Sequence, residues 1–148
     1  MNEQMIQQML PKLVPFVKFL GVTIEAVGNG TSRAQLKSRP DVHNHLATMH
    51  AGALYTTGES ATGAVVLALF GDLFPNVFIA LKTASVTHIK ALPGDLIAHA
   101  SVDGDPTEIR AAYDTEGRVD FTVNVRFTVD DVEVAHVDYV WAARAPRS

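Results

Sequence analysis

The stretch HNHLATMHAGALYTTGESATGAVVLALF, residues 43–70, decides the fold of this chain. Its second part, residues 51–70, is rich in Ala, Leu and Val and ends before Gly71, which predicts one long helix. Gly58 and Gly63 lie inside that helix, although each costs about 0.8–1.0 kcal/mol relative to alanine in a helix interior. With the neighbouring alanines they make the helix surface thin, which indicates that a sheet wraps closely around it.

Strand patterns lie on both sides of this helix. Residues 21–38 predict a hairpin that turns at Asn29-Gly30, and residues 1–21 predict a short amphipathic helix before it. Residues 76–92 carry apolar side chains on both faces, which predicts a central strand. A turn at residues 93–95 and a further strand from residue 96 follow.

The end of the chain has the clearest alternation. Residues 119–129 alternate apolar and polar side chains, and Asp130-Asp131 predicts a turn into a return strand over residues 132–144. The return strand changes phase near Ala135 or His136, which indicates a bulge. Before these strands, Asp105 and Pro106 predict the start of a short helix that runs to Gly117.

These elements predict an α+β fold, an antiparallel sheet around one long helix, in a single domain over residues 1–148. A curved sheet leaves a face or an edge uncovered, so a partner chain is expected to cover it.

Composition excludes several classes of function. The net charge of −4 disfavours a nucleic-acid surface, which would need clustered Lys and Arg. The absence of cysteine excludes disulfides, thiolate nucleophiles and Cys-ligated zinc. The longest apolar run, Ala64–Phe70, is far below the roughly 20 residues needed to cross a bilayer. The first residues do not resemble a signal peptide, so a cytoplasmic location is expected.

Glu59 is the candidate catalytic residue. It lies in the apolar helix with no Lys or Arg three or four residues away to pair with it. Burying an unpaired carboxylate among apolar residues destabilises a fold, so its presence here indicates a functional role. The alternative is a solvated stripe on the helix, which would be more widely polar than this one.

The segment resembles the hotdog-fold thioesterases related to the phenylacetic-acid-pathway thioesterase. Their hallmark is an Asn six positions before His-Gly-Gly, and an acidic residue nine positions after that His. Asn44, His50-Ala51-Gly52 and Glu59 reproduce both intervals, although Ala51 replaces the central glycine. Another hotdog branch has a hydroxyl four residues after the acid, where this chain has Gly63.

The resemblance implies a hotdog fold and hydrolysis of an acyl-coenzyme A thioester without a cofactor or metal. The backbone N–H of Ala51 or Gly52 would bind the developing oxyanion, and Glu59 would activate water or attack the carbonyl. Asn44 would position the water or the carbonyl, and His50 would shape the helix start.

The spacing of these residues argues for a shared site. Ala51 and Glu59 are about 12 Å apart along the helix and point in different directions. The resemblance implies a homodimer, or a tetramer built from two dimers, in which Glu59 of one chain faces Asn44 and Ala51 of the other. Thr62 and Gly63, near Glu59 on the helix, are candidate substrate contacts.

Six residues outside this segment also have assignments. Lys82 and Lys90 are candidate contacts for coenzyme A phosphates. His88 and His99 are expected to be packed or hydrogen-bonded, and Tyr139 and Trp141 are expected in a core or an interface.

Three alternatives remain open. His43, His45 and His50 could be metal ligands, although no Asp or Glu lies among them. A hotdog hydratase or dehydratase would use His45 and Glu59. A hotdog dimer could also bind acyl chains or acyl-coenzyme A without catalysis.

Overall fold

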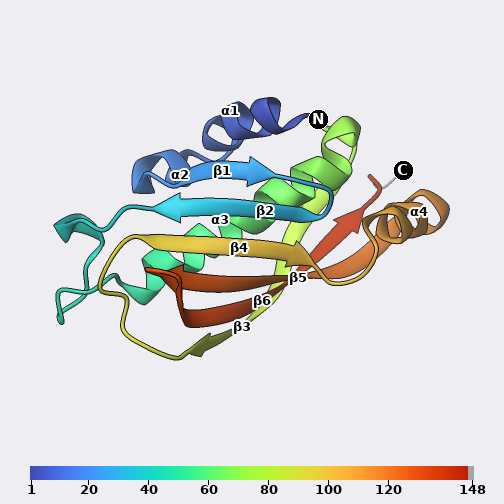
Figure 1. The fold of residues 1–148 in the computed structure, drawn as a ribbon. Helices are drawn as coiled ribbons and strands as arrows, with labels where there is room; N and C mark the ends of the chain where they lie inside the picture. Colours follow the sequence, from blue (N-terminus) through green and yellow to red (C-terminus); the bar gives the residue numbers. More distant parts are fainter. Residues whose placement is uncertain (147–148) are drawn as a thin grey trace.

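The computed structural model describes residues 1–146, so Arg147 and Ser148, the last residues of the expected domain, lie outside it. Within the described residues, six strands form one antiparallel sheet in the order β1-β2-β4-β5-β6-β3 (Figure 1). The elements are α1 (Glu3–Leu13), α2 (Pro15–Leu20), β1 (Thr23–Val27), β2 (Thr31–Leu36), η1 (Pro40–Val42), α3 (Ala51–Phe70), η2 (Gly71–Leu73), β3 (Phe78–His88), β4 (Leu96–Val102), α4 (Pro106–Glu116), β5 (Arg118–Val129) and β6 (Val132–Arg144).

The long helix α3 packs on one face of the sheet, and α1 and α2 lie beside the β1 edge (Figure 1). Most of α3 is buried, including Leu54, Val65 and Phe70, because the sheet, α1, α2 and α4 pack around it. The predicted long helix enclosed by an antiparallel sheet is confirmed. No helix among the described residues has the length and apolarity that a membrane crossing requires.

At Gly58, α3 lies close to the sheet. A Cβ atom at this position would lie 2.3 Å from the Tyr139 hydroxyl and 2.5 Å from Cζ of Phe127. Tyr139 is fully buried, and its hydroxyl donates to the Tyr55 carbonyl at 2.7 Å. Gly63 faces α1 instead, where a Cβ would lie 3.5 Å from Cδ1 of Leu10. Close packing of the sheet therefore explains Gly58 but not Gly63.

Gly58→Ala is expected to destabilise the protein by about 1–3 kcal/mol or more, because the methyl group must displace buried Tyr139 or Phe127. Gly63→Ala is the matched control, since its methyl meets only an ordinary contact and alanine is the better helix former. Thermal unfolding should show a lower Tm for Gly58→Ala, by about 2–4 °C per kcal/mol at this size. Equal Tm values for the two variants would contradict this account of Gly58.

The turns and the inserted helix agree with the sequence. Gly30 has a φ of 75° in the β1–β2 turn, and Asp130 and Asp131 both have positive φ in the β5–β6 turn. The Asp105 side chain accepts from the Thr107 N–H at 2.7 Å and caps α4. The bulge in β6 falls at Val134, which the β5–β6 register skips, next to the predicted position.

The leading segment forms two helices rather than the one predicted. Val14 separates them with φ −123° and ψ 89°, and Pro15 begins α2. The proline disfavours helical geometry at the residue before it, so the chain breaks at Val14. This break allows the two helices to bend around α3.

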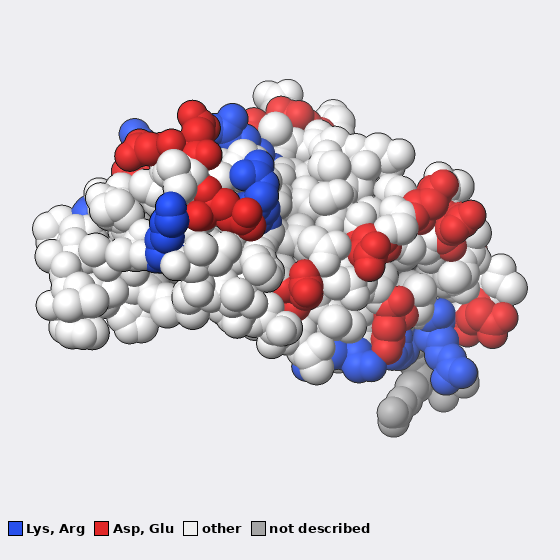
Figure 2. Space-filling view, turned by 60° about the horizontal axis from the view of Figure 1, so that its bottom comes forward, with Lys and Arg blue, Asp and Glu red and all other residues white. Residues whose placement is uncertain are grey.

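The prediction that residues 76–92 form a central strand is wrong for this chain. β3 pairs only with β6 and lies at the edge of the sheet (Figure 1). Phe78, Val86 and Ile89 are exposed on or next to it. Figure 2, which is turned so that the β3 side of the molecule comes forward, shows a broad area without charged side chains. Elsewhere in this view, Lys and Arg residues lie among Asp and Glu residues.

The opposite edge of the sheet is protected by α1. The Val27 N–H donates to Oε2 of Glu3 at 3.4 Å, and Nε2 of Gln7 donates to the Glu25 carbonyl at 3.2 Å. The described residues provide no such cover for β3. An uncovered edge strand presents backbone N–H and C=O groups with which another strand can pair, and in residues 1–146 β3 is such an edge.

Candidate functional site

The N-terminus of α3 offers one free backbone donor. His50 is the N-cap residue, and its Nδ1 accepts from the Gly52 N–H at 2.8 Å. The Gly52 N–H is therefore already bonded. The Ala51 N–H has no acceptor among residues 1–146, and a helix N-terminus favours negative charge. Of the two predicted oxyanion donors, only Ala51 is free to serve.

Asn44 organises the loop that precedes α3. Its Oδ1 accepts from the Leu46 N–H at 2.9 Å and from the Thr48 N–H at 3.2 Å. Its Nδ2 donates to the Thr48 hydroxyl at 3.1 Å. The loop also holds Ala47 in the left-handed region, with a φ of 56°. The side-chain oxygen of Asn44 is committed to this turn, so Asn44 shapes the approach to Ala51.

This loop and the segment after β3 line an open pocket of about 420 Å³, here called the loop pocket. The Met49 N–H donates to the Leu92 carbonyl at 3.0 Å and joins the two segments. The pocket lies at the α3 N-terminus, and Lys90 brings it an ammonium group with no ion-pair partner in the described chain. The loop pocket is lined by Asn44, Leu46, Thr48, Met49, Ala51, His88, Ile89, Lys90, Ala91 and Leu92.

Glu59 lies in a different and smaller cavity of about 90 Å³, here called the Glu59 cavity. It is formed where α1 and α2 meet α3 and the end of β6. Its lining residues are Leu10, Val14, Phe16, Val17, Thr56, Glu59, Ser60, Gly63 and Trp141. No residue lines both this cavity and the loop pocket, so within one chain Glu59 is not brought to Asn44 and Ala51.

The Glu59 carboxylate is half-buried and has no hydrogen-bond or ion-pair partner among the residues described. Burial raises its pKa above the ordinary glutamate value. The pKa of neighbouring Tyr55 is also raised, by burial and then by the charge of Glu59. A desolvated carboxylate without a partner is a stronger proton acceptor than one in water, as a catalytic base requires.

Replacing Glu59 with glutamine should stabilise the protein at neutral pH. Because the folded pKa is raised, the folded state holds the Glu59 proton more tightly than the unfolded state does. The charged carboxylate therefore costs stability above the folded pKa, and the cost disappears below the unfolded pKa. Thermal unfolding should give a higher Tm for Glu59→Gln at pH 7 and equal values near pH 3. A lower Tm at pH 7 would contradict the unpaired state of Glu59.

Trp141, which the sequence predicted in a core or an interface but not in the site, is a wall of the Glu59 cavity. Its indole N–H donates to the Thr62 hydroxyl at 3.0 Å, and that hydroxyl donates to the Glu59 carbonyl at 2.8 Å. Thr62 is fully buried and supports Trp141, whereas Gly63 lines the cavity itself. The alternation of Val137, Tyr139 and Trp141 was the signal that placed this side chain on the inner face.

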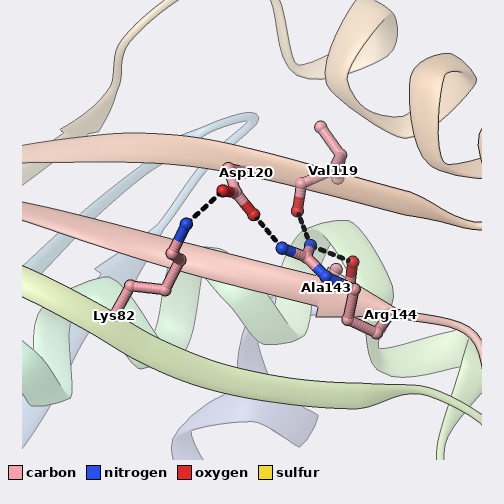
Figure 3. Close-up of polar contacts among 5 residues, drawn as sticks. All are labelled: Lys82, Val119, Asp120, Ala143 and Arg144. Atoms are coloured by element: carbon pink, nitrogen blue, oxygen red, sulfur yellow. Dashed lines mark hydrogen bonds and ion pairs between the residues drawn. The ribbon is translucent and has the colours of Figure 1, made fainter.

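The two candidate lysines lie in different settings. Lys82 pairs with Asp120, which also pairs with Arg144, and Arg144 donates to the Val119 carbonyl at 2.9 Å (Figure 3). The Asp120 pKa is lowered by these two cations. Lys90 is exposed in the loop pocket. Lys90 is thus the better placed of the two to contact a phosphate.

The histidines do not converge on one point. Nε2 of His43 is 2.8 Å from the Ser38 hydroxyl, while His45 is exposed on the loop. In the described part of the chain, no three His, Asp or Glu side chains are grouped to hold a metal ion. Nε2 of His99 lies 3.1 Å from the Thr128 hydroxyl, as predicted, but His88 is exposed in the loop pocket rather than packed.

Known proteins share this architecture. The chain is similar to a protein of unknown function from Pseudomonas aeruginosa that is described as a probable thioesterase, with a TM-score of 0.83, 20% identity, and coverage of 97% of this chain and 95% of that one. It is similar to a mutant thioesterase from the same organism, with a TM-score of 0.77, 15% identity, and coverage of 95% and 94%. The chain is also similar to a protein of unknown function from Chlorobaculum tepidum, with a TM-score of 0.82 and 13% identity. That match covers 97% of this chain and 94% of the other. No curated protein matches.

These similarities show the fold, and the predicted α+β hotdog architecture is confirmed. A family model described as a domain of unknown function, DUF4442, matches residues 2–142, which is nearly the whole sequence. The chain therefore belongs to the DUF4442 family.

Proposed function

We propose that this protein hydrolyses an acyl-coenzyme A thioester as a homodimer with two shared sites. The observation that carries the proposal is the pair of complementary half-sites in each chain. One is the free Ala51 N–H at the α3 N-terminus in the loop pocket, and the other is the unpaired, half-buried carboxylate in the Glu59 cavity. An oxyanion donor and a base are the two groups that thioester hydrolysis needs.

The register of β3 supports the sharing of the site. Trp141 of the Glu59 cavity is paired with Leu81, near the start of β3, whereas the loop pocket adjoins His88 at its end. These two points are about 23 Å apart along the strand. If β3 pairs antiparallel with β3 of a second copy, the end of one strand meets the start of the other. The loop pocket of one chain then approaches the Glu59 cavity of its partner.

The Ala51 N–H, the Glu59 carboxylate and a water molecule account for every bond and proton in thioester hydrolysis. Water attacks the thioester carbonyl, a C–O bond forms, and the Ala51 N–H stabilises the resulting oxyanion. Glu59 of the partner takes the proton from the water and returns it to the sulfur as the C–S bond breaks. If Glu59 instead attacks the carbonyl itself, the C–S bond breaks and the leaving thiolate takes a proton from water, and the hydroxide so formed cleaves the resulting anhydride. Either route yields a carboxylic acid and free coenzyme A, and neither needs a cofactor.

Two further observations support this substrate. The intervals between Asn44, His50 and Glu59 resemble those of the phenylacetic-acid-pathway thioesterases. Of the solved structures with this fold, one is described as a probable thioesterase and another as a mutant thioesterase. Lys90 stands at the loop pocket without an ion-pair partner in residues 1–146, where the phosphates of coenzyme A would find a cation.

The direct test is a panel of acyl-coenzyme A thioesters assayed with a thiol-trapping reagent. The wild-type protein should release thiol from at least one member of the panel, and Glu59→Ala should not. If the wild type binds acyl-coenzyme A but releases no thiol, the protein is a non-catalytic acyl-coenzyme A binder and not a hydrolase. Hydration of an enoyl-coenzyme A, detected by loss of its double bond, would favour the use of His45 and Glu59, which the chain by itself does not bring together.

Lys90→Ala is expected to raise KM for acyl-coenzyme A more than it lowers kcat. The nucleotide end of the substrate is held equally in the ground and transition states, so its loss weakens binding without slowing the chemical step. Lys82→Ala is the control, because Lys82 is already paired with Asp120. Steady-state kinetics over a range of salt concentrations would measure both. A larger KM effect for Lys82→Ala would transfer the phosphate contact to that residue.

A further inference from the structure

We infer that the Glu59 cavity receives the acyl group of the substrate, and that α1, α2 and Trp141 restrict this group to a short aliphatic chain. The inference deepens the proposed function and rests on it. It identifies the N-terminal helices as the element that determines substrate specificity.

The lining of the Glu59 cavity is suited to a hydrocarbon. The Thr56 hydroxyl donates to the Gly52 carbonyl at 3.0 Å, and the Ser60 hydroxyl donates to the Thr56 carbonyl at 2.6 Å. The Trp141 N–H is bonded to Thr62. The hydroxyl and indole donors of these side chains are therefore already used within the protein. The remaining contacts come from Leu10, Val14, Phe16, Val17 and Gly63.

The loop pocket has the opposite character. It contains the free Ala51 N–H and the unpaired Lys90 ammonium. The pantetheine arm of coenzyme A carries two amides and ends in phosphates, so it would lose hydrogen bonds in the Glu59 cavity but finds polar partners in the loop pocket. With the carbonyl held between the two half-sites, the acyl chain must extend into the Glu59 cavity.

The walls of the cavity limit the length of that chain. Leu10 and Val17 are buried, and Trp141 is held in place by its bond to Thr62. Phe16 is 55% exposed and so lies at the rim. The volume of about 90 Å³ is less than a quarter of that of the loop pocket. A rigid cavity of this size favours each added methylene until it is full and then rejects the next.

Trp141 is the only tryptophan of the chain, so its fluorescence reports directly on the cavity. The experiment titrates the Glu59→Gln protein, in which the ligand is consumed at least about 10²-fold more slowly, with saturated acyl-coenzyme A from two carbons upward. Affinity followed by Trp141 emission should rise about fourfold per methylene and then fall when the cavity is full. Coenzyme A alone should leave the emission unchanged.

Two variants change the size of the cavity in opposite directions. Gly63→Ala has room for its methyl group, 3.5 Å from Cδ1 of Leu10, and should shorten the preferred chain by about one carbon. Leu10→Ala removes part of a wall and should lengthen the preferred chain. Leu13→Ala, on the exposed side of α1, is the matched control and should keep the wild-type preference.

The outcomes separate the two proposals. A Trp141 response to coenzyme A alone, or a chain-length preference that neither Gly63→Ala nor Leu10→Ala shifts, would overturn the acyl assignment. The wild type could hydrolyse no thioester while its Trp141 emission still depends on chain length and that dependence shifts in both variants. This result would refute the hydrolytic function and support the acyl site.

Discussion

Glu59→Gln is expected to reduce acyl-coenzyme A hydrolysis by at least about 10²-fold, within the range of about 10²–10⁴-fold that general acid–base catalysis contributes. Glutamine keeps the size of the side chain but cannot accept the proton of the attacking water. The loss should appear in kcat, because the Glu59 cavity and the loop pocket keep their shape and still bind substrate. Single-turnover measurements with the best substrate of the panel would measure it.

The controls for this variant are stability and pH dependence. The Tm of Glu59→Gln should not fall, so any loss of activity is not a loss of folding. In the wild type, activity should rise with pH through a pKa above the ordinary glutamate value, because only the deprotonated carboxylate is active and burial raises its pKa. Turnover of Glu59→Gln at the wild-type rate, or an acid limb at the ordinary glutamate pKa, would remove Glu59 from the mechanism.

Mixing two inactive variants should restore about a quarter of wild-type activity. Asn44→Ala disrupts the loop that positions the Ala51 N–H, and Glu59→Ala removes the base. Each homodimer carries its lesion in both sites. In a mixed dimer one site carries both lesions, and the other combines an intact loop with an intact Glu59. Random reassociation makes about half of the dimers mixed, each with one working site of two.

The measurement is the thiol-release rate of the co-refolded proteins, with mixed dimers confirmed by mass. The two parents refolded separately and then combined without exchange are the matched control, and they should show only the mean of their residual activities. The same low value in confirmed mixed dimers would mean that Asn44 and Glu59 of one chain act together. In that case the antiparallel pairing of β3 with β3 of a second copy would not be what forms the site.

Local patterns in the sequence were sufficient for most elements of the fold, although the leading segment forms two helices rather than one. The apolar run of residues 51–70 and the alternation of residues 119–129 each report their own secondary structure, because burial on one face imposes its period on neighbouring residues. The sequence excluded a charged partner for Glu59 on its own helix, because such a partner would lie three or four residues away. The turns at Asn29-Gly30 and Asp130-Asp131 follow from local backbone preferences as well.

Contacts between distant segments decided the rest. Residues 76–92 are apolar on both faces, yet whether they lie at the centre or the edge depends on which strands pair, and β3 is an edge. The bond from the Gly52 N–H to His50 is local and agrees with the predicted role of His50 at the helix start, but only the structure shows that it leaves Ala51 as the free donor. The Glu59 cavity joins α1, α2, α3 and β6, segments up to 131 residues apart between Leu10 and Trp141. Periodicity along the chain cannot predict this cavity, because the cavity forms only when these distant elements pack against one another.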